Sequence, residues 1–229
     1  MKKEVNPAKS IIELAESYTD SPGIRALCQL IPFGIGSAFD VGVTGYIEQF
    51  RQERAKVFFD ELAEETKNFT DQNSLSDSMK FRFYSSFLPA INARRVEKTR
   101  NFARLFKNSI TCSSLISDDD FEDFVSIIET LSYREFQILL ILLNFEEANP
   151  REETKSEVQM AFKFWKDFLL EVESATKTNQ DEVGAYLLKI SRTGCCEVFT
   201  GAYTGYKGGM GRTTPTFKKL LLQLGNIKA

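Results

Sequence analysis

Apolar residues recur at helical spacing along most of this chain, and helix-starting and helix-ending residues separate the stripes. The first stripe follows Asn6 and Pro7, an N-cap with a proline at the first helical position. A longer stripe predicts a helix from about residue 46 to residue 69, and another covers residues 96–110. Between these two, Pro89 is expected to kink or split a helix because proline removes a backbone donor.

Capping signals are equally clear in the second half of the chain. Ser117 precedes three aspartates, which fall in a first helical turn where the macrodipole favours negative charge. Ser132 and Glu135 form a capping-box pattern. The run that follows, residues 133–145, is apolar nearly all round and is expected to be the buried centre of the fold. Residues 158–172 carry a further helical stripe.

The pattern changes near the C-terminus. Residues 181–194 predict a short helix that Gly194 stops, and residues 195–213 predict a β-hairpin with a glycine-rich tip. Thr214 and Pro215 then open a last helix, which Gly225 is placed to terminate.

The order helix, helix, hairpin, helix across residues 133–224 resembles a winged-helix module. Residues 181–194 take the position of its recognition helix, and residues 195–213 take that of its wing. We therefore expect a mainly α fold in which a multi-helix bundle is followed by a winged-helix-like subdomain with one small β-hairpin. The expected division places the bundle at residues 1–112 and the winged-helix-like part at residues 113–229.

A winged-helix arrangement raises the hypothesis of DNA binding. A helix that reads duplex DNA presents several cationic or amide side chains to phosphates and base edges. Here Asp181 and Glu182 offset the cations, so the pattern favours a role in protein packing over strong DNA affinity. The candidate contacts of this module are Lys189, Arg192, Lys207 and Arg212.

The most basic part of the chain lies on the helix predicted over residues 96–110 and just before it. Glu97 is the only acid among six cations there, and the cations alternate with apolar positions. The simplest interpretation is a helix face exposed to solvent. The more specific interpretation is a surface that contacts an acidic partner or an anionic lipid surface. The candidate anionic-partner contacts are Arg94, Arg95, Lys98, Arg100, Arg104 and Lys107.

One stretch, from Ile24 to Ile47, is apolar enough to suggest a membrane. Arg25 and Asp40 would each cost about 2.5–3.5 kcal/mol near a bilayer centre, and a Pro/Gly turn would break a single helix near its middle. The simpler interpretation is a buried pair of helices that the glycines allow to pack closely. The more specific interpretation is a hairpin that is buried at rest and enters a membrane only when it is released. The candidate membrane or partner hairpin carries Pro32, Gly34, Gly36 and Phe39.

The composition excludes several kinds of catalytic and metal-binding site. None of the 229 residues is a histidine, which excludes Ser-His-Asp and Cys-His nucleophile systems and histidine-ligated metals. The four cysteines show no CxxC spacing, and the adjacent Cys195 and Cys196 cannot easily bridge, so buried thiols are expected. The glycines over residues 205–212 match no nucleotide-binding motif and are expected to form a flexible wing tip. We expect no catalytic residue, no cofactor and no metal site.

Charge and the N-terminal pattern add little about partners. The formal net charge of −3 does not indicate any particular class of partner. The opening residues MKKEVNPAKS hold no apolar region of the secretory kind, so a cytoplasmic location is expected, with peripheral membrane contact as an extension of it.

Five stretches carry a resemblance to a known family: residues 21–64, VEKTRNFARLFKNSI, DDDFEDFVSIIETLSYREFQILLIL, LLKISRTGCCEV and GRTTPTFKKLL. Together they resemble poorly characterised helical bacterial proteins, including those of the abortive-infection alpha type. The resemblance implies a bacterial cytoplasmic protein with a phage-defence locus as its expected setting, and it supplies no catalytic residue. The chain departs from that pattern by an insertion around residues 151–177 and by its glycine-rich wing.

The expected function is that of a non-enzymatic interaction or effector protein. It would act through contacts with a protein partner or with itself, and a conditional membrane contact is an additional hypothesis. A winged-helix regulator that binds duplex DNA is the alternative.

Overall fold

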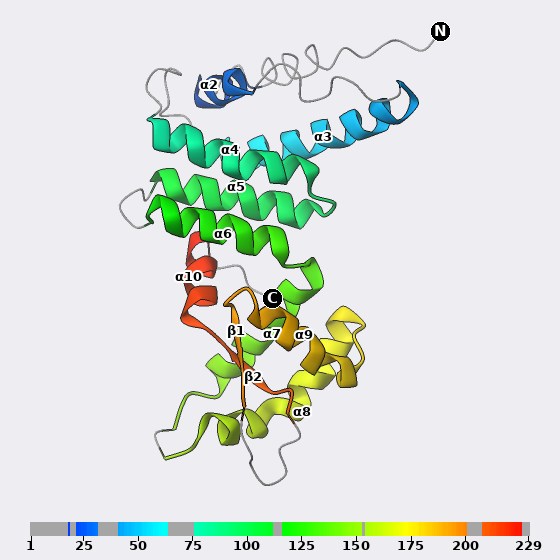
Figure 1. The fold of residues 1–229 in the computed structure, drawn as a ribbon, viewed down its shortest axis with the longest axis vertical. Coiled ribbons are helices and arrows are strands. Elements are labelled where there is room, and N and C mark those ends of the chain that lie inside the picture. The colour runs from blue at the N-terminus through cyan, green and yellow to red at the C-terminus, as the bar shows by residue number, and fades with distance from the viewer. Residues whose placement is uncertain are drawn as a thin grey trace. The chain divides into compact units, whose positions relative to one another are not determined.

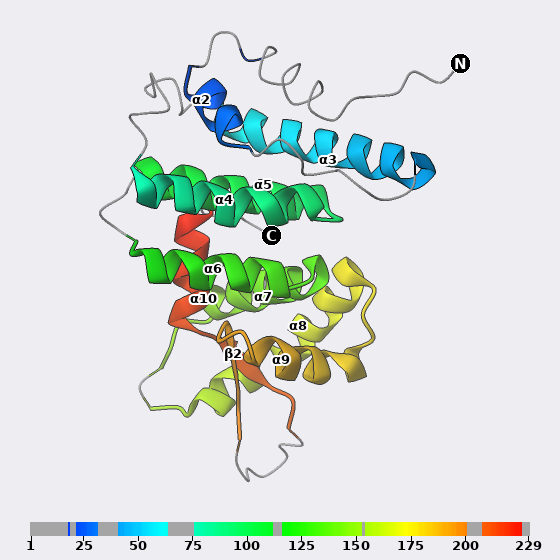
Figure 2. The same cartoon turned by 45° about the horizontal axis from the view of Figure 1, so that its top comes forward.

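The computed structural model describes residue 18 and residues 22–31, 41–63, 76–111, 116–152, 154–200 and 208–225. Within these residues the fold is mainly α-helical with a small two-stranded antiparallel hairpin near the C-terminus, which confirms the expected fold class at that level. Figures 1 and 2 show the same chain in two orientations.

The chain divides into two compact units, unit 1 at residues 1–129 and unit 2 at residues 130–229. The sequence placed the division at 112/113, which falls inside unit 1. The difference arises at the helix that begins at Asp118, because the carboxylate of Asp118 is bound by Ser78 and Arg82 of an earlier helix. These two contacts hold the helix in unit 1, although the capping residue before it, Ser117, suggested the start of a new segment.

Unit 1 consists of helices in which α3, α4 and α5 pack against one another. Its described helices are α2 (Pro22–Leu30), α3 (Val41–Leu62), α4 (Asp77–Asn92), α5 (Val96–Thr111) and α6 (Asp118–Thr130). The N-terminal part of α3 extends beyond the turn that joins α4 to α5, as both views show (Figures 1 and 2).

An aromatic cluster fills the core of unit 1. Its ring centroids lie 5.1 to 6.4 Å apart in stacked, tilted and edge-to-face pairs, an arrangement that adds to the free energy gained by burying the rings. The helical spacing of the phenylalanines predicts this burial. The cluster consists of Phe58, Phe59, Phe83, Phe87 and Phe106.

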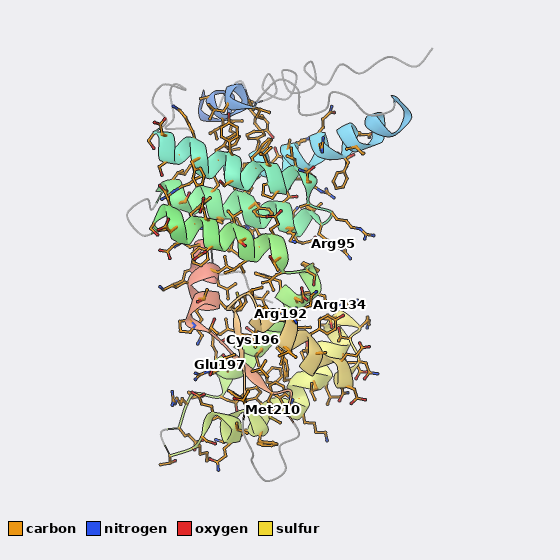
Figure 3. All side chains as sticks on the ribbon, in the orientation of Figure 1. Arg95, Arg134, Arg192, Cys196, Glu197 and Met210 are labelled. Atoms are coloured by element: carbon orange, nitrogen blue, oxygen red, sulfur yellow. The ribbon has the colours of Figure 1, made fainter. Side chains whose placement is uncertain are left out.

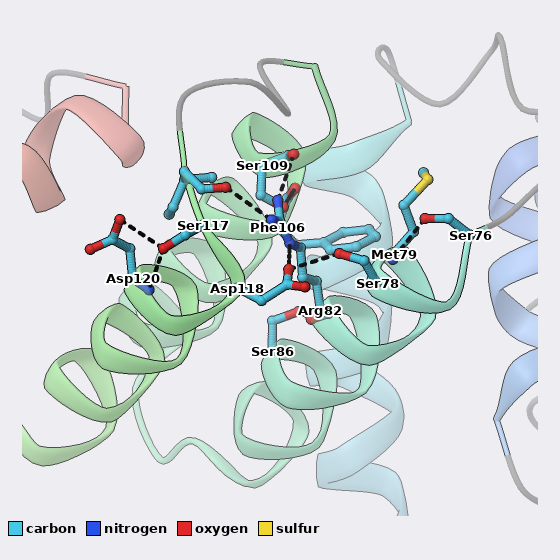
Figure 4. Close-up of polar contacts among 11 residues, drawn as sticks. Ser76, Ser78, Met79, Arg82, Ser86, Phe106, Ser109, Ser117, Asp118 and Asp120 are labelled. Atoms are coloured by element: carbon cyan, nitrogen blue, oxygen red, sulfur yellow. Dashed lines mark hydrogen bonds and ion pairs between the residues drawn. The ribbon is translucent and has the colours of Figure 1, made fainter.

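A buried arginine joins three segments of unit 1 (Figure 4). Arg82 of α4 is only 6% exposed, and its Nε donates to Asp118 Oδ1 at 2.7 Å. Its Nη1 and Nη2 donate to the carbonyl oxygens of Ser109 and Ile116, each at 3.0 Å. The guanidinium also lies 5.5 Å from the ring centroid of Phe121. One side chain therefore fixes the end of α5, the segment after it and the start of α6 against α4.

Two sequence expectations for unit 1 need correction. The long helix α3 begins at Val41, five residues before the expected start, and residues 64–75, on which its expected end falls, lie outside the described residues. Pro89 does not split the helical pattern, because α4 continues through it to Asn92. Proline near the end of a helix removes a hydrogen bond from the last turns only.

Unit 2 builds its core from two long helices. The rings of Phe145, Phe164, Trp165 and Phe168 meet between α7 and α8, and Phe136 meets Phe217 edge to face. The described elements are α7 (Tyr133–Ala148), α8 (Glu157–Thr176), the 3₁₀ turn η3 (Gln180–Glu182), α9 (Val183–Ser191), β1 (Cys196–Val198), β2 (Gly211–Thr213) and α10 (Pro215–Gln223).

The predicted caps are present. Ser132 Oγ accepts from the Glu135 amide at 3.2 Å while Glu135 Oε2 accepts from the Ser132 amide at 2.7 Å, which completes the capping box of α7. Thr214 caps α10 through its side chain, with Pro215 at the first helical position. Ser117 likewise accepts from the amide of Asp120 at 3.0 Å.

The hairpin strands pair with Cys196 opposite Thr213, Glu197 opposite Arg212 and Val198 opposite Gly211. Gly211 is required in this register, because a Cβ there would lie 2.6 Å from the Glu197 carbonyl oxygen. Gly184 of α9 meets the hairpin at Gly209, where a Cβ on Gly184 would lie 3.1 Å from the Gly209 Cα. Glycine at positions 184 and 209 therefore allows α9 to approach the hairpin backbone closely.

Replacing Arg82 tests how much unit 1 depends on this contact. Arg82→Met keeps the aliphatic stem but leaves two buried carbonyl oxygens without a donor, so the free energy of opening α4 and α6 should fall by about 2–4 kcal/mol. Hydrogen exchange of the α4 and α6 amides measures this directly. Lys80→Met is the control, because Lys80 pairs only with a fully exposed aspartate on the surface of α4. Equal protection in Arg82→Met and wild type would show that the contact is dispensable.

Candidate functional site

Helix α9 occupies the position that the sequence assigns to a recognition helix. One face is buried through Val183, Leu187 and Ile190, and packs within unit 2. The opposite face is exposed, and it carries Ala185, Leu188, Lys189 and Arg192. Figure 3 shows Arg192 at the end of this helix.

The first predicted contact, Lys189, is engaged within unit 2. Its Nζ lies 2.7 Å from Oε1 of Glu135, a residue that is 1% exposed at the start of α7. The ammonium and the carboxylate therefore form an ion pair between α9 and α7. A buried carboxylate without any counter-charge is costly, which makes Lys189 a structural partner of α7.

The ionisation of Glu135 reflects the same contact. Burial raises the pKa of Glu135, but the Lys189 ammonium and the bonds to Ser132 outweigh it and hold the pKa below its ordinary value. Glu135 therefore stays charged, both as part of the capping box and as the counter-charge of Lys189.

The second predicted contact, Arg212, is also engaged. Its Nε and Nη2 donate to Glu197 Oε2 at 3.0 and 2.7 Å, and its Nη1 pairs with Glu157. The desolvation of Arg212 lowers its pKa, and the surrounding carboxylates more than compensate and raise it. This arginine joins the two strands of the hairpin to the start of α8.

Next to Arg212, a further carboxylate ties the hairpin to α7. Glu146 accepts from the Thr213 amide at 2.7 Å and from the Thr213 hydroxyl. Burial raises the pKa of Glu146 more than these bonds lower it. Neither Glu146 nor Glu157 stood out in the sequence, because their partner strand lies more than 50 residues away.

Of the two remaining predicted contacts, Arg192 is exposed at the C-cap of α9, and Lys207 lies outside the described residues. The cations predicted to form a DNA-contacting set are therefore divided between internal ion pairs and the surface. The outer face of α9 is centred on Leu188, which is 59% exposed. On another side of α9, the Tyr186 hydroxyl accepts from Arg134 Nη1 at 2.9 Å.

The cations predicted on and just before α5 are likewise divided between internal contacts and the surface. Lys98 Nζ donates to the Glu129 carbonyl oxygen at 2.7 Å near the end of α6, and Arg104 Nε pairs with Glu61 at 2.8 Å. Lys107 is half-buried. Arg94, Arg95 and Arg100 are the exposed members of the set.

Two arginines of α3, which the sequence did not single out, lie at the turn between α4 and α5. Arg51 Nε donates to Asn92 Oδ1 at 3.0 Å. Arg54 donates to the carbonyl oxygens of Ala93 and Arg94 at 3.1 and 3.0 Å, and its guanidinium lies 4.5 Å from the ring centroid of Phe50. The structure thus gathers cations from two distant segments at one end of unit 1.

The three cysteines that the structure describes do not form a reactive site. Cys28, Cys195 and Cys196 are free and buried, as expected, and Cys112 lies outside the described residues. Burial raises the pKa of Cys28 and of Cys196 to about 12 and also raises that of Cys195, which disfavours the nucleophilic thiolate. Across the described ranges, no group of three or more cysteine or acidic side chains is placed to hold a metal ion.

The predicted membrane or partner hairpin of Pro32, Gly34, Gly36 and Phe39 lies outside the described residues. Among the helices that are described, none has both the length and the apolar character needed to cross a bilayer.

Comparison of the chain with family models, with curated proteins and with solved structures gave no match.

The pairing of Lys189 with Glu135 gives a direct stability test. Lys189→Met leaves the Glu135 carboxylate buried without its counter-charge, and we expect unit 2 to lose about 1–2 kcal/mol of stability, a modest loss because solvent screens the exposed lysine. The double variant Glu135→Gln, Lys189→Met removes the charge and should recover most of that loss. Chemical denaturation, followed by the fluorescence of the single tryptophan, Trp165, measures both.

The pH dependence of the same variants has a defined sign. Because the folded pKa of Glu135 lies below its unfolded value, the contribution of the pair is present above the unfolded pKa and is lost as pH falls through the folded one. The difference between wild type and Lys189→Met should therefore shrink in acid. A difference that stays constant from neutral pH to below the ordinary glutamate pKa would contradict this role.

Proposed function

We propose that this protein is a non-enzymatic interaction protein whose unit 2 binds a protein partner through the outer face of α9. The observation that carries the proposal is the composition of that face. Leu188 stands at its centre and is more than half exposed, whereas Lys189 is engaged by Glu135. A large exposed aliphatic side chain on a rigid helix suits a protein contact, since aliphatic groups gain free energy by burial against another apolar surface.

The surroundings of Leu188 support the same proposal. Ala185, one turn earlier on α9, adds a small apolar position, and Arg192, one turn later, is a cation at the rim. An apolar centre with a polar rim is the usual composition of a protein interface.

The rigidity of the helix matters for this proposal. Val183, Leu187 and Ile190 bury the inner face of α9, and Gly184 holds it against the hairpin backbone. A surface that is fixed before binding loses little conformational entropy on association. The packing of α9 within unit 2 thus provides a scaffold for the contact face.

The DNA-binding alternative depends on the cations of the same module. Arg192 is the observation in its favour. Against it, Lys189 and Arg212 would have to leave carboxylates in order to meet phosphates, and each departure would cost an ion pair. Protein binding requires no such rearrangement.

The setting of this interaction is a second part of the proposal. We place it in a bacterial phage-defence system of the abortive-infection type, on the strength of the sequence resemblance. In that setting the protein would act as an effector or adaptor component, and the partner of unit 2 would belong to the same system.

Site-specific photo-crosslinking in the cell tests the contact face. A photoreactive phenylalanine analogue in place of Leu188 should give a discrete adduct of higher mass that survives nuclease and disappears with protease. The matched control carries the same analogue in place of Leu170, which is 48% exposed on α8 of the same unit.

The outcome decides between the two functions. An adduct at position 188 and none at position 170 supports a protein partner on α9. An adduct that nuclease removes supports the DNA-binding alternative, and equal labelling at both positions contradicts a specific contact at α9.

A further inference from the structure

Unit 1 carries a cluster of cations at one end, which we call the arginine corner. It is formed where α3 passes the turn between α4 and α5, and the bonds of Arg51 to Asn92 and of Arg54 to Ala93 hold α3 at this turn. The arginine corner consists of Arg51, Arg54, Arg94 and Arg95.

Two of these guanidinium groups can bind a ligand without breaking an ion pair with the described residues of unit 1. Arg51 uses only its Nε, and its two terminal nitrogens meet no acceptor among the described residues. The side chain of Arg94 is exposed and has no ion pair within the described ranges. Because Asn92 fixes the Arg51 guanidinium in place, little side-chain entropy remains to be lost on binding.

An apolar surface adjoins the arginine corner. Ile47 and Phe50 lie on the same face of α3 as Arg51 and Arg54, at helical spacing. Ile47 is 42% exposed, because this part of α3 extends beyond the α4–α5 turn (Figures 1 and 2). The surface therefore offers both arginine forks and an aliphatic contact.

The other end of unit 1 carries the opposite charge. Asp119, Glu122 and Asp123 follow one another at i, i+3 and i+4 on α6, and all three are exposed. None has an ion pair within the described ranges. These residues, which we call the acidic stripe, stand apart from the neighbouring Asp118, which Arg82 binds.

The arginine corner and the acidic stripe cannot meet within one copy of unit 1. The stripe lies near the start of α4, as the bond of Ser78 to Asp118 shows, while the corner lies at the end of α4. Helix α4 has 16 residues, which corresponds to about 24 Å, well beyond the screening length of about 8–10 Å in physiological salt.

We propose that the arginine corner binds the acidic stripe of a second copy of this chain, so that copies associate head to tail. The contact is heterologous, because each copy uses two different surfaces and therefore keeps one of each available for the next copy. It involves a surface of unit 1 and does not depend on the α9 contact proposed above.

A second copy fits the corner better than a nucleic acid or a lipid surface does. Arginine binds carboxylates through paired N–H groups, and this chain already pairs Arg82, Arg104 and Arg212 with carboxylates. The net charge of −3 opposes the approach of large polyanions. Ile47 can gain free energy against a protein surface, whereas a phosphodiester chain offers it little apolar area.

Sedimentation of two neutralised variants tests the proposal with the full chain. Arg51→Gln, Arg94→Gln removes two charges of the corner, and Asp119→Asn, Asp123→Asn removes two charges of the stripe. The wild type should self-associate at about 50 mM salt and return to monomer at about 500 mM. Each variant alone should associate at least about tenfold more weakly.

Mixing the two variants provides the decisive measurement. The first variant keeps its acidic stripe and the second keeps its arginine corner, so the mixture should form a 1:1 pair that grows no further. The control Arg151→Gln, Lys166→Gln removes two charges from unit 2 and should associate like the wild type.

The proposal is wrong if the wild type is monomeric at low salt, or if both variants associate as the wild type does. It is also wrong if the mixture of variants forms no pair. Failure here leaves the α9 contact untouched, because that contact is tested by labelling at Leu188, on another unit.

Discussion

The burial of the Arg82 guanidinium is the interaction on which unit 1 depends. A guanidinium taken out of water needs acceptors for its N–H groups, and Arg82 finds them in Asp118, Ser109 and Ile116. Those acceptors belong to the end of α5 and the start of α6, so satisfying one charge determines where both helices lie against α4. The aromatic cluster stabilises the packing of α3, α4 and α5, and the arginine attaches α6 to it.

The same constraint acts in unit 2, where it keeps two cations in internal ion pairs. Glu135 is buried by its place in the capping box, so Lys189 must stay near it. Arg212 pairs with Glu197 within the hairpin and with Glu157 of α8, and so holds the hairpin to that helix. Both cations would be natural phosphate ligands if they were free, and internal pairing leaves Leu188 as the largest feature of the outer face of α9. The outer face of α9 thus exposes an aliphatic side chain beside a cation that is already paired.

Local patterns in the sequence predict the elements well. The capping box at Ser132, the Thr214–Pro215 start of α10 and the short hairpin all follow from residues within a few positions of one another. The start of α3 was predicted wrongly, and Pro89 does not split α4, because packing against neighbouring helices outweighs local propensity there.

Long-range pairs account for what the sequence could not predict. Arg82 and Asp118 are 36 residues apart, and Arg212 and Glu157 are 55 apart, so no periodicity marks them as partners. The predicted basic face of α5 illustrates the point. Lys98 and Arg104 lie on it as expected but are occupied by other helices of unit 1, while Arg51 joins the exposed cations from α3. Charge along a sequence shows where cations are, and only the fold shows which of them are available.

The internal pairing of the cations of unit 2 is tested most directly by an equilibrium titration of the purified protein with labelled duplex DNA at low salt. Paired cations predict a flat titration for the wild type, and they predict that Glu135→Gln, which releases Lys189, gives at least as much binding as the wild type. Saturable wild-type binding that weakens steeply with salt and is lost on replacing Lys189 and Arg212 would contradict the account.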